Sequence, residues 1–207
     1  MAQLDFYFDF GSPTAYIAYT ALPKIAEAAG VAINWRPMLL GGVFKATGNT
    51  SPVLVAAKGK WMMRDIVAFC DRFGLPPARN KHFPINTLPL MRGAMACQQD
   101  GRLADYIGAM FQAIWVDGKD MNDMATIGAV LSAAGFDPHA IAARIGEQEI
   151  KDALIAATEE AVARGIFGAP TIFVDDDMYF GQDRLPFVAQ ALGVDFNGLF
   201  PDYLAVK

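Results

Sequence analysis

The two side chains that most often bind transition metals or carry redox chemistry are scarce in this sequence. Its 207 residues include only two cysteines, Cys70 and Cys97, and two histidines, His82 and His139. The cysteines lie in unrelated segments, so they form neither a Cys-x-x-Cys redox pair nor a cluster with zinc-ligand spacing. The sequence therefore predicts no metal site and no dithiol redox centre.

Charge and long apolar runs are also limited. Charged residues make up 19% of the chain, the formal net charge is −5 and the pI is near 4.9. Because an acidic chain without basic runs is poorly suited to neutralising phosphates, we expect no nucleic-acid partner. The apolar runs are short, and the first ten residues lack the pattern of a signal peptide. We therefore expect a cytoplasmic protein without membrane association.

Apolar side chains, in contrast, are abundant. Hydrophobic residues make up 54% of the chain, which is more than the core of a minimal monomer of this length needs. We expect the surplus to line a pocket or a subunit contact, and this favours a homodimer.

The start of the chain has the pattern of a β-α-β unit. Residues 3–10 alternate apolar and polar side chains, which is the period of a strand. Ser12 and Pro13 then supply an N-cap and a proline suited to the first helical position, and the helix is expected to end at Gly30. Residues 31–36 predict a second strand. This order and length are typical of a parallel strand pair joined by a helix.

The middle of the chain is predicted to be helical. A glycine-rich segment from about residue 40 predicts a long loop, and helical periodicity follows, with one apolar face over residues 61–73 and another over residues 95–116. Further helix boundaries are expected at the N-caps Asp123 and Asp137 and just before Gly135 and Gly165.

Strand signals return only near the end of the chain. Residues 171–174 and 178–181 predict a hairpin, and a helix is expected from about residue 184 to 192. The complete order predicts an α/β protein with a thioredoxin-like fold interrupted by an all-helical insertion domain. We expect residues 1–40 and 166–207 to form the thioredoxin-like domain and residues 41–165 to form the helical insertion domain.

Three short segments offer groups that can bind a ligand. Ser12 stands at a helix start, where the helix dipole and free N–H groups stabilise an anion such as a thiolate, although it also fits a simple helix cap. Ala169 and Pro170 precede the hairpin and fit either a cis peptide facing a cleft or an ordinary trans loop. Gln182 and Asp183 open the last helix and can hold an α-amino-acid group or merely cap that helix. In a thioredoxin fold these three segments converge on one cleft.

Several segments, in order along nearly the whole chain, resemble the motifs of 2-hydroxychromene-2-carboxylate isomerases and their kappa-class glutathione transferase relatives. They are DFYFDFGSPTAYIA, Asn49 in the glycine-rich loop, KGKWMMRD at 58–65, FPIN at 83–86, GIFGAPTIFV at 165–174 and YFGQDRL at 179–185. The resemblance implies a glutathione-dependent isomerase of aromatic degradation, which interconverts 2-hydroxychromene-2-carboxylate-type hemiketals and trans-o-hydroxybenzylidenepyruvate-type products. Glutathione would then be a recycled cofactor.

The resemblance also implies a role for individual residues. Ser12 would be the catalytic residue, because its hydroxyl would hydrogen-bond the glutathione sulfur. The remaining cofactor-binding groups would be the backbone at Ala169 and Pro170 for the cysteinyl part, Gln182 and Asp183 for the γ-glutamyl end, and Asn49 for the tripeptide.

We also expect residues of the middle segment to bind an aromatic carboxylate substrate. Lys58 and Arg64 would attract its carboxylate, although such side chains are usually solvated. Trp61, Met62, Phe83 and Trp115 would wall the aromatic ring, although these residue types also serve as core.

Three other functions remain open at this point. A transferase that conjugates glutathione to an electrophile would use the same Ser12 and Asp183. A disulfide oxidoreductase shares the scaffold but needs a cysteine at the helix start, where Gly11-Ser12-Pro13-Thr14 has none. A glutathione-binding protein without turnover is the non-enzymatic alternative.

Overall fold

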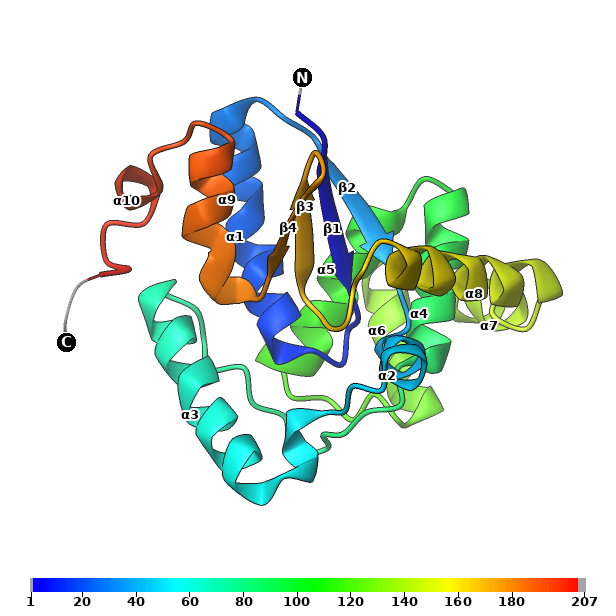
Figure 1. Cartoon of the computed structure of the whole chain (residues 1–207). Helices are drawn as coiled ribbons and strands as arrows, with labels where there is room; N and C mark the ends of the chain where they lie inside the picture. Colours follow the sequence, from blue (N-terminus) through cyan, green and yellow to red (C-terminus); the bar gives the residue numbers. More distant parts are fainter. Residues whose placement is uncertain (1, 205–207) are drawn as a thin grey trace.

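The computed structural model describes residues 2–204, which build a mixed four-stranded sheet in the order β2-β1-β3-β4 (Figure 1). Strand β1 (Leu4–Phe8) pairs in parallel with β2 (Ile33–Pro37) and antiparallel with β3 (Thr171–Val174). Strand β4 (Asp177–Phe180) pairs antiparallel with β3. The four predicted strands are confirmed, and their ends lie at most two residues from the expected positions.

Helix α1 (Pro13–Ala29) begins and ends where the sequence predicted. The Ser12 hydroxyl accepts a hydrogen bond from the N–H of Ala15, and Gly30 ends the helix in the left-handed region at a φ of 67°. Helix α1 packs beside α9 (Leu185–Ala191) on one face of the sheet (Figure 1). The β-α-β unit at the start of the chain is thereby confirmed.

Both faces of β1 are buried. Phe6 and Phe8 point into the main apolar core, whereas Tyr7 packs on the opposite face with Phe173 and with Ala161 of α8 (Gln148–Ala163). The alternation seen in the sequence therefore separates two covered faces, rather than an inner face from a solvated one.

The polar residues of β1 are held by a network of charged side chains. Asp5 is fully buried, and its carboxylate lies 2.6 Å from Arg164 Nη1 and 3.5 Å from Arg36 Nε. Arg164 also donates to the Tyr7 hydroxyl, which donates to Glu160. Burial acts to raise the pKa of Asp5, but the hydrogen bond from Arg164 and the other donors outweigh it and lower that pKa.

Between β2 and β3 the chain forms helices joined by turns and loops. The helices before α8 are α2 (Leu40–Thr47), α3 (Ala56–Arg72), α4 (Leu88–Gln99), α5 (Leu103–Phe111), α6 (Met124–Ala133) and α7 (Pro138–Arg144), and α10 (Phe196–Leu199) follows α9. The expected N-caps are confirmed: Asp123 accepts from the N–H of Thr126, and Asp137 accepts from the N–H of His139. Gly135 and Gly165 follow helices α6 and α8 with positive φ, as expected.

Two sequence-based expectations for this region are wrong. The long loop expected from residue 40 instead begins with α2, which includes Gly41 and Gly42. The helix expected over residues 95–116 is interrupted after α4, because Gly101 adopts the left-handed region at a φ of 70°. Helix α5 then ends in a wide π-helical turn, Gln112–Val116.

The helices pack directly against the sheet. The Phe111 ring of α5 lies 5.9 Å from the Phe8 ring and 5.1 Å from the Phe10 ring. The division into two domains at residues 40 and 165 stays a prediction, as do the homodimer and the cytoplasmic location. Within residues 2–204, no helix combines the length and the apolar character needed to cross a membrane.

Replacing Asp5 by asparagine is expected to lower the free energy of unfolding by about 2 kcal/mol at pH 7, because Arg164 loses its carboxylate partner. This value is below the range for a fully buried pair, since the Arg164 side chain is 26% exposed. A lowered carboxyl pKa stabilises the fold above the ordinary value of 3.8, and this stabilisation is lost as the pH falls through the lowered pKa.

Urea unfolding of the wild type and Asp5→Asn at pH 7 and at pH 3 measures this effect. The difference between the two proteins should shrink at pH 3. Asp176→Asn, in the exposed β3–β4 turn, is the matched control. An Asp5→Asn protein that is as stable as this control at pH 7 would contradict the assigned role of the ion pair.

Candidate functional site

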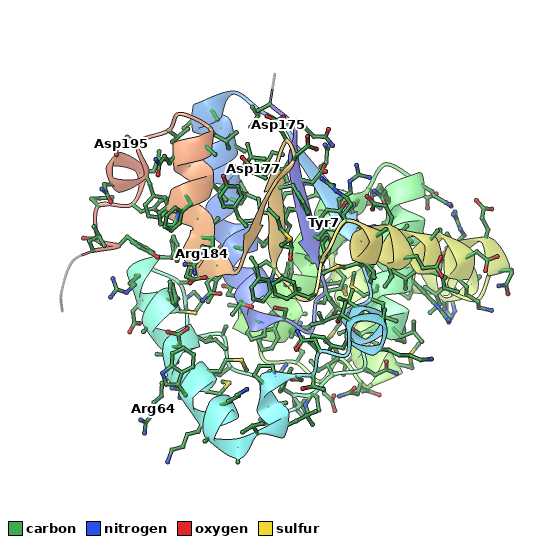
Figure 2. All side chains as sticks on the ribbon, in the orientation of Figure 1. Tyr7, Arg64, Asp175, Asp177, Arg184 and Asp195 are labelled. Carbon is green, nitrogen blue, oxygen red and sulfur yellow. The ribbon has the colours of Figure 1, made fainter. Side chains whose placement is uncertain are left out.

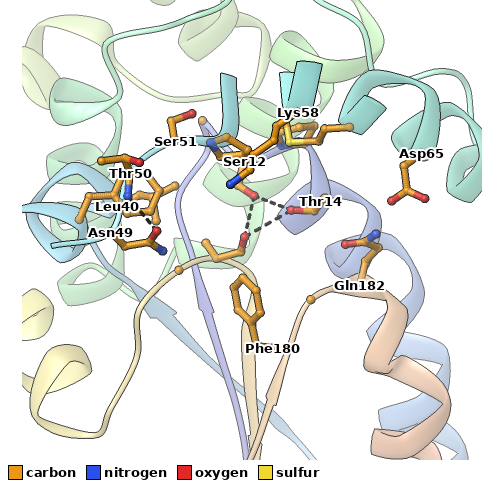
Figure 3. Close-up of a pocket in the computed structure, with 18 of the residues that line it drawn as sticks. Ser12, Thr14, Leu40, Asn49, Thr50, Ser51, Lys58, Asp65, Phe180 and Gln182 are labelled. Carbon is orange, nitrogen blue, oxygen red and sulfur yellow. Dashed lines mark hydrogen bonds between the residues drawn. The ribbon is translucent and has the colours of Figure 1, made fainter. Parts of the chain in front are cut away.

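A cavity of about 520 Å³ opens beyond the carboxyl end of β1 (Figure 3). Its walls come from residues 11–14 at the start of α1, residues 49–52 after α2, one face of α3, residues 168–169 before β3 and residues 180–184 after β4. Segments far apart in the sequence therefore meet at one site, as the thioredoxin-like arrangement predicted.

Most of the predicted site residues line this cavity. They are Ser12, Asn49, Lys58, Trp61, Phe83, Ala169, Gln182 and Asp183. Pro170 is buried beside the lining rather than in it. Arg64 is exposed and points away from the cavity (Figure 2), so the structure does not bring it to the site.

The position of Arg64 follows from helical spacing. Lys58, Trp61, Met62 and Asp65 are spaced i, i+3, i+4 and i+7 along α3 and therefore share the face that lines the cavity. Arg64 falls outside this stripe. The same spacing identifies Asp65, a cavity residue that the sequence analysis missed although it ends the KGKWMMRD segment.

Ser12 lies at the centre of the hydrogen bonds in the cavity (Figure 3). Its hydroxyl accepts from the N–H of Ala15 at 3.1 Å, lies 2.9 Å from Thr14 Oγ1 and is placed to donate to the carbonyl oxygen of Ala169 at 3.2 Å. Thr14 Oγ1 also reaches that carbonyl, at 3.3 Å. Because Thr14 can satisfy the Ala169 carbonyl, the single proton of Ser12 is free to turn toward a ligand.

The loop opposite Ser12 is fixed from two sides. The Ala169–Pro170 peptide bond is cis, and the carbonyl oxygen of Pro170 accepts from the N–H of Gly181 at 3.0 Å. Asn49 donates to the carbonyl oxygen of Phe167 at 2.8 Å, which ties the segment after α2 to this loop. The side-chain nitrogen of Asn49 thus supports the cavity wall.

One end of the cavity carries two carboxylates, those of Asp65 and Asp183. Asp183 pairs with Arg184 at 3.0 Å, and the preceding residue, Gln182, is buried. Asp65 lies near Gln182 in Figure 3. Burial and then the negative charge of Asp183 raise the pKa of Asp65. Asp183 is already paired with Arg184, whereas Asp65 forms no ion pair within residues 2–204 and can attract a bound cationic group.

The other polar and aromatic groups lie toward the mouth. Lys58 and Trp61 are exposed, and Phe83 is half-buried with its ring 5.9 Å from that of Trp115. Trp115 does not line the cavity, so of the two roles considered for it, ligand wall or core, the structure shows the core. Its indole N–H donates to the carbonyl oxygen of Phe10 at 2.8 Å, which holds it in the core.

Asp9 is a second residue that the sequence analysis missed. Its carboxylate is 1% exposed and accepts from the N–H of Gly11 and from the N–H of Leu40, each at 2.8 Å. The N–H of Ser12 donates to the Asp9 carbonyl at 3.1 Å. Burial raises the pKa of Asp9 although these N–H groups and Thr87 act to lower it. One buried residue therefore positions both Ser12 and the start of α2.

The sequence profile of the DSBA-like thioredoxin domain matches residues 3–193 of the chain. The chain belongs to this family. Its DSBA-like domain carries serine at the helix start, and its two cysteines are buried and free. Neither cysteine lines the cavity.

Relatives of this DSBA-like domain include named enzymes. The chain is 32% identical to a 2-hydroxychromene-2-carboxylate isomerase of Pseudomonas sp. (strain C18), covering 92% of this chain and 90% of the relative. It is 26% identical to glutathione S-transferase kappa 1 of Rattus norvegicus, covering 99% and 96%. A solved 2-hydroxychromene-2-carboxylate isomerase matches with a TM-score of 0.83 at 28% identity, covering 92% and 94%. These matches confirm both the motif resemblance and the thioredoxin-like fold.

Replacing Asp9 by asparagine is expected to lower the free energy of unfolding by about 1 to 3 kcal/mol, because the amide nitrogen of asparagine would face a backbone N–H. A carboxyl pKa raised by folding makes ionisation unfavourable in the folded protein. The stability of the wild type relative to Asp9→Asn should therefore fall as the pH rises above the ordinary value of 3.8.

Urea unfolding of both proteins between pH 3.5 and pH 7 (about the range over which carboxyls titrate) tests this dependence. Asp202→Asn serves as an exposed control. A difference that instead grows with pH would show that Asp9 is stabilised as the anion, contrary to the argument from burial.

Proposed function

We propose that the protein is a glutathione-dependent isomerase acting on 2-hydroxychromene-2-carboxylate-type hemiketals. The observation that carries the proposal is the Ser12 hydroxyl, placed at the α1 N-terminus in a cavity where none of the lining residues among 2–204 is a cysteine. The N-terminus of a helix stabilises a thiolate. Because no cysteine lines the cavity, a ligand has to supply the thiol. The similarity to the named isomerases supports the reaction class.

The cavity residues fit glutathione, which has one ammonium group and two carboxylates. Asp65 and Asp183 would hold the ammonium group, while Arg184 offers positive charge for the carboxylates. The volume of about 520 Å³ lies in the range of small-molecule sites. The residues that line the cavity thus complement the charges of the tripeptide.

Further polar groups at the cavity would orient the tripeptide. Gln182 is buried beside the two carboxylates and would bind the γ-glutamyl end. The backbone of Ala169, beside Pro170, would pair with the extended cysteinyl part. Asn49 would support this loop through its hydrogen bond to the carbonyl oxygen of Phe167. When bound, glutathione supplies the thiol whose reversible addition permits rotation about a carbon–carbon double bond.

Ser12 would hold the sulfur as a thiolate. Its hydroxyl donates one hydrogen bond, and the dipole of α1 adds a favourable field, and both lower a thiol pKa. Thr14 would keep the Ala169 carbonyl hydrogen-bonded while the Ser12 proton points at the ligand. Ser12 therefore acts as a donor to a thiol and not as a nucleophile.

The wall formed by α3 would bind the substrate. The Lys58 ammonium group would pair with the substrate carboxylate, and Trp61 and Phe83 would contact the aromatic ring. Trp61 is 65% exposed, so an aromatic ligand at the mouth would cover apolar surface that water now contacts.

A transferase that conjugates glutathione to an electrophile is the second candidate. The similarity over nearly the whole chain to glutathione S-transferase kappa 1 favours it. The groups proposed to bind and ionise glutathione would serve this reaction equally, so the two candidates differ in the fate of the thiol.

Replacing Ser12 by alanine is expected to lower kcat about 100-fold, because a charge-assisted hydrogen bond of roughly 3 kcal/mol to the sulfur is lost. Glutathione affinity should fall only modestly, and loss of the helix cap should cost about 1 kcal/mol of stability. Steady-state kinetics, calorimetric binding and the ultraviolet absorbance of the bound thiolate measure these effects. Ser51→Ala, a change elsewhere in the same lining, is the matched control. Unchanged thiol-dependent turnover in Ser12→Ala would refute the role of Ser12.

Measurement of free glutathione decides between the two reactions. With a 2-hydroxychromene-2-carboxylate hemiketal as substrate, we expect product to accumulate over many turnovers while the concentration of free thiol stays constant. Stoichiometric loss of free thiol with recovery of a conjugate would favour the transferase. Glutathione binding without turnover on hemiketals or electrophiles would leave only a binding protein.

A further inference from the structure

A second cavity, of about 620 Å³, lies on the far side of α2. It is formed by residues of α2, α4 and α8 together with Leu39, which precedes α2, and it shares no lining residue with the first cavity. Leu40 and Phe44 of α2 line the first cavity, whereas Gly42 and Lys45 line the second. Helix α2 is therefore a wall between two separate sites.

The second cavity combines an apolar floor with a cationic rim. Its apolar lining residues include Leu39, Leu88, Leu154, Ile155 and Val162. Each of the three helices adds one cation, and these are Lys45, Arg92 and Lys151. Glu159 is the one acidic residue in this lining. A local excess of positive charge thus surrounds apolar surface in a chain whose net charge is −5.

The three cations lack partners in the described part of the chain. Within residues 2–204 none of them forms an ion pair with a carboxylate. The Nε atom of Arg92 is buried and has no hydrogen-bond acceptor. Arg92 is half-buried and lines the cavity, so an anionic ligand there would give its side chain the carboxylate partner that it lacks.

We propose that the second cavity binds an amphipathic carboxylate, with one carboxylate on an apolar body. The guanidinium of Arg92 pairs with the carboxylate, Lys45 and Lys151 add long-range attraction, and the leucine-rich floor covers the hydrocarbon. The volume of the cavity lies in the range of small-molecule sites.

Other occupants fit the surface less well. An inorganic anion would leave the apolar floor in water. A second copy of the chain, related by a twofold axis through this cavity, would place the same cations against one another. A small amphipathic anion meets both requirements at once.

Calorimetric titration with decanoate tests the proposal, and decanamide is the uncharged control ligand. Glutathione is present throughout at a saturating concentration, so that the first cavity is occupied if it binds the tripeptide. We expect decanoate to bind at one site per chain and decanamide to bind at least about tenfold more weakly, since the ion pair to Arg92 contributes at least about that factor.

Variants locate the binding site. Arg92→Gln should weaken decanoate binding about tenfold, and Lys58→Gln, in the first cavity, should leave it unchanged. If Arg92→Gln does not fold, the double variant Lys45→Gln with Lys151→Gln should show the weakening instead. Lys81→Gln, an exposed lysine outside both linings, controls for the loss of a charge.

Three results would overturn the proposal. They are the absence of decanoate binding to the wild type, equal binding of decanamide and decanoate, and weakening by Lys58→Gln but not by the rim variants. The glutathione assays on Ser12→Ala do not depend on the second cavity, so failure of one proposal leaves the other intact.

Discussion

The site depends on one buried carboxylate. The side chain of Asp9 binds the N–H of Gly11 with one oxygen and the N–H of Leu40 with the other. The first bond shapes the turn that delivers Ser12 to the start of α1, and the second fixes the start of α2. These two N–H groups and Thr87 stabilise the carboxylate and act to lower its pKa, but burial outweighs them and raises that pKa. Asp9 therefore fixes both the turn that carries Ser12 into the first cavity and the start of α2, which separates the two cavities.

The pairing of β1 with β3 brings the remaining groups to Ser12. Tyr7 pairs with Thr171 at the end of the antiparallel ladder, so the segments that follow Tyr7 and precede Thr171 leave the sheet side by side. Ser12 and Ala169 lie on these two segments, and the hydroxyl of one reaches the carbonyl of the other. Ser12 and Ala169 are 157 positions apart in the sequence, yet their contact follows from the register of β1 against β3.

Short sequence patterns predicted the helix starts that depend on hydrogen bonds between neighbouring residues. Ser12 caps α1, and Asp123 and Asp137 cap later helices, because a short polar side chain satisfies N–H groups only a few residues away. The positions of Asp65 and Trp115 relative to the cavity were not predicted. Helical spacing would have placed Asp65 with Lys58, but only the packing of the core shows that Trp115 is turned inward, where its N–H binds the Phe10 carbonyl.

Helix α2 could not be predicted, because tertiary contacts determine where it begins. Its first turn contains two glycines, which weaken a helix in isolation. The N–H of Leu39 is bound by Thr158 of α8 at 3.0 Å, and the N–H of Leu40 is bound by Asp9 of the strand end, so acceptors on both sides replace a local cap. A Cβ atom at Gly42 would lie 3.0 Å from the Thr158 methyl group. The glycine that indicates a loop in the sequence is therefore the residue that lets α2 approach α8 closely enough to be held there.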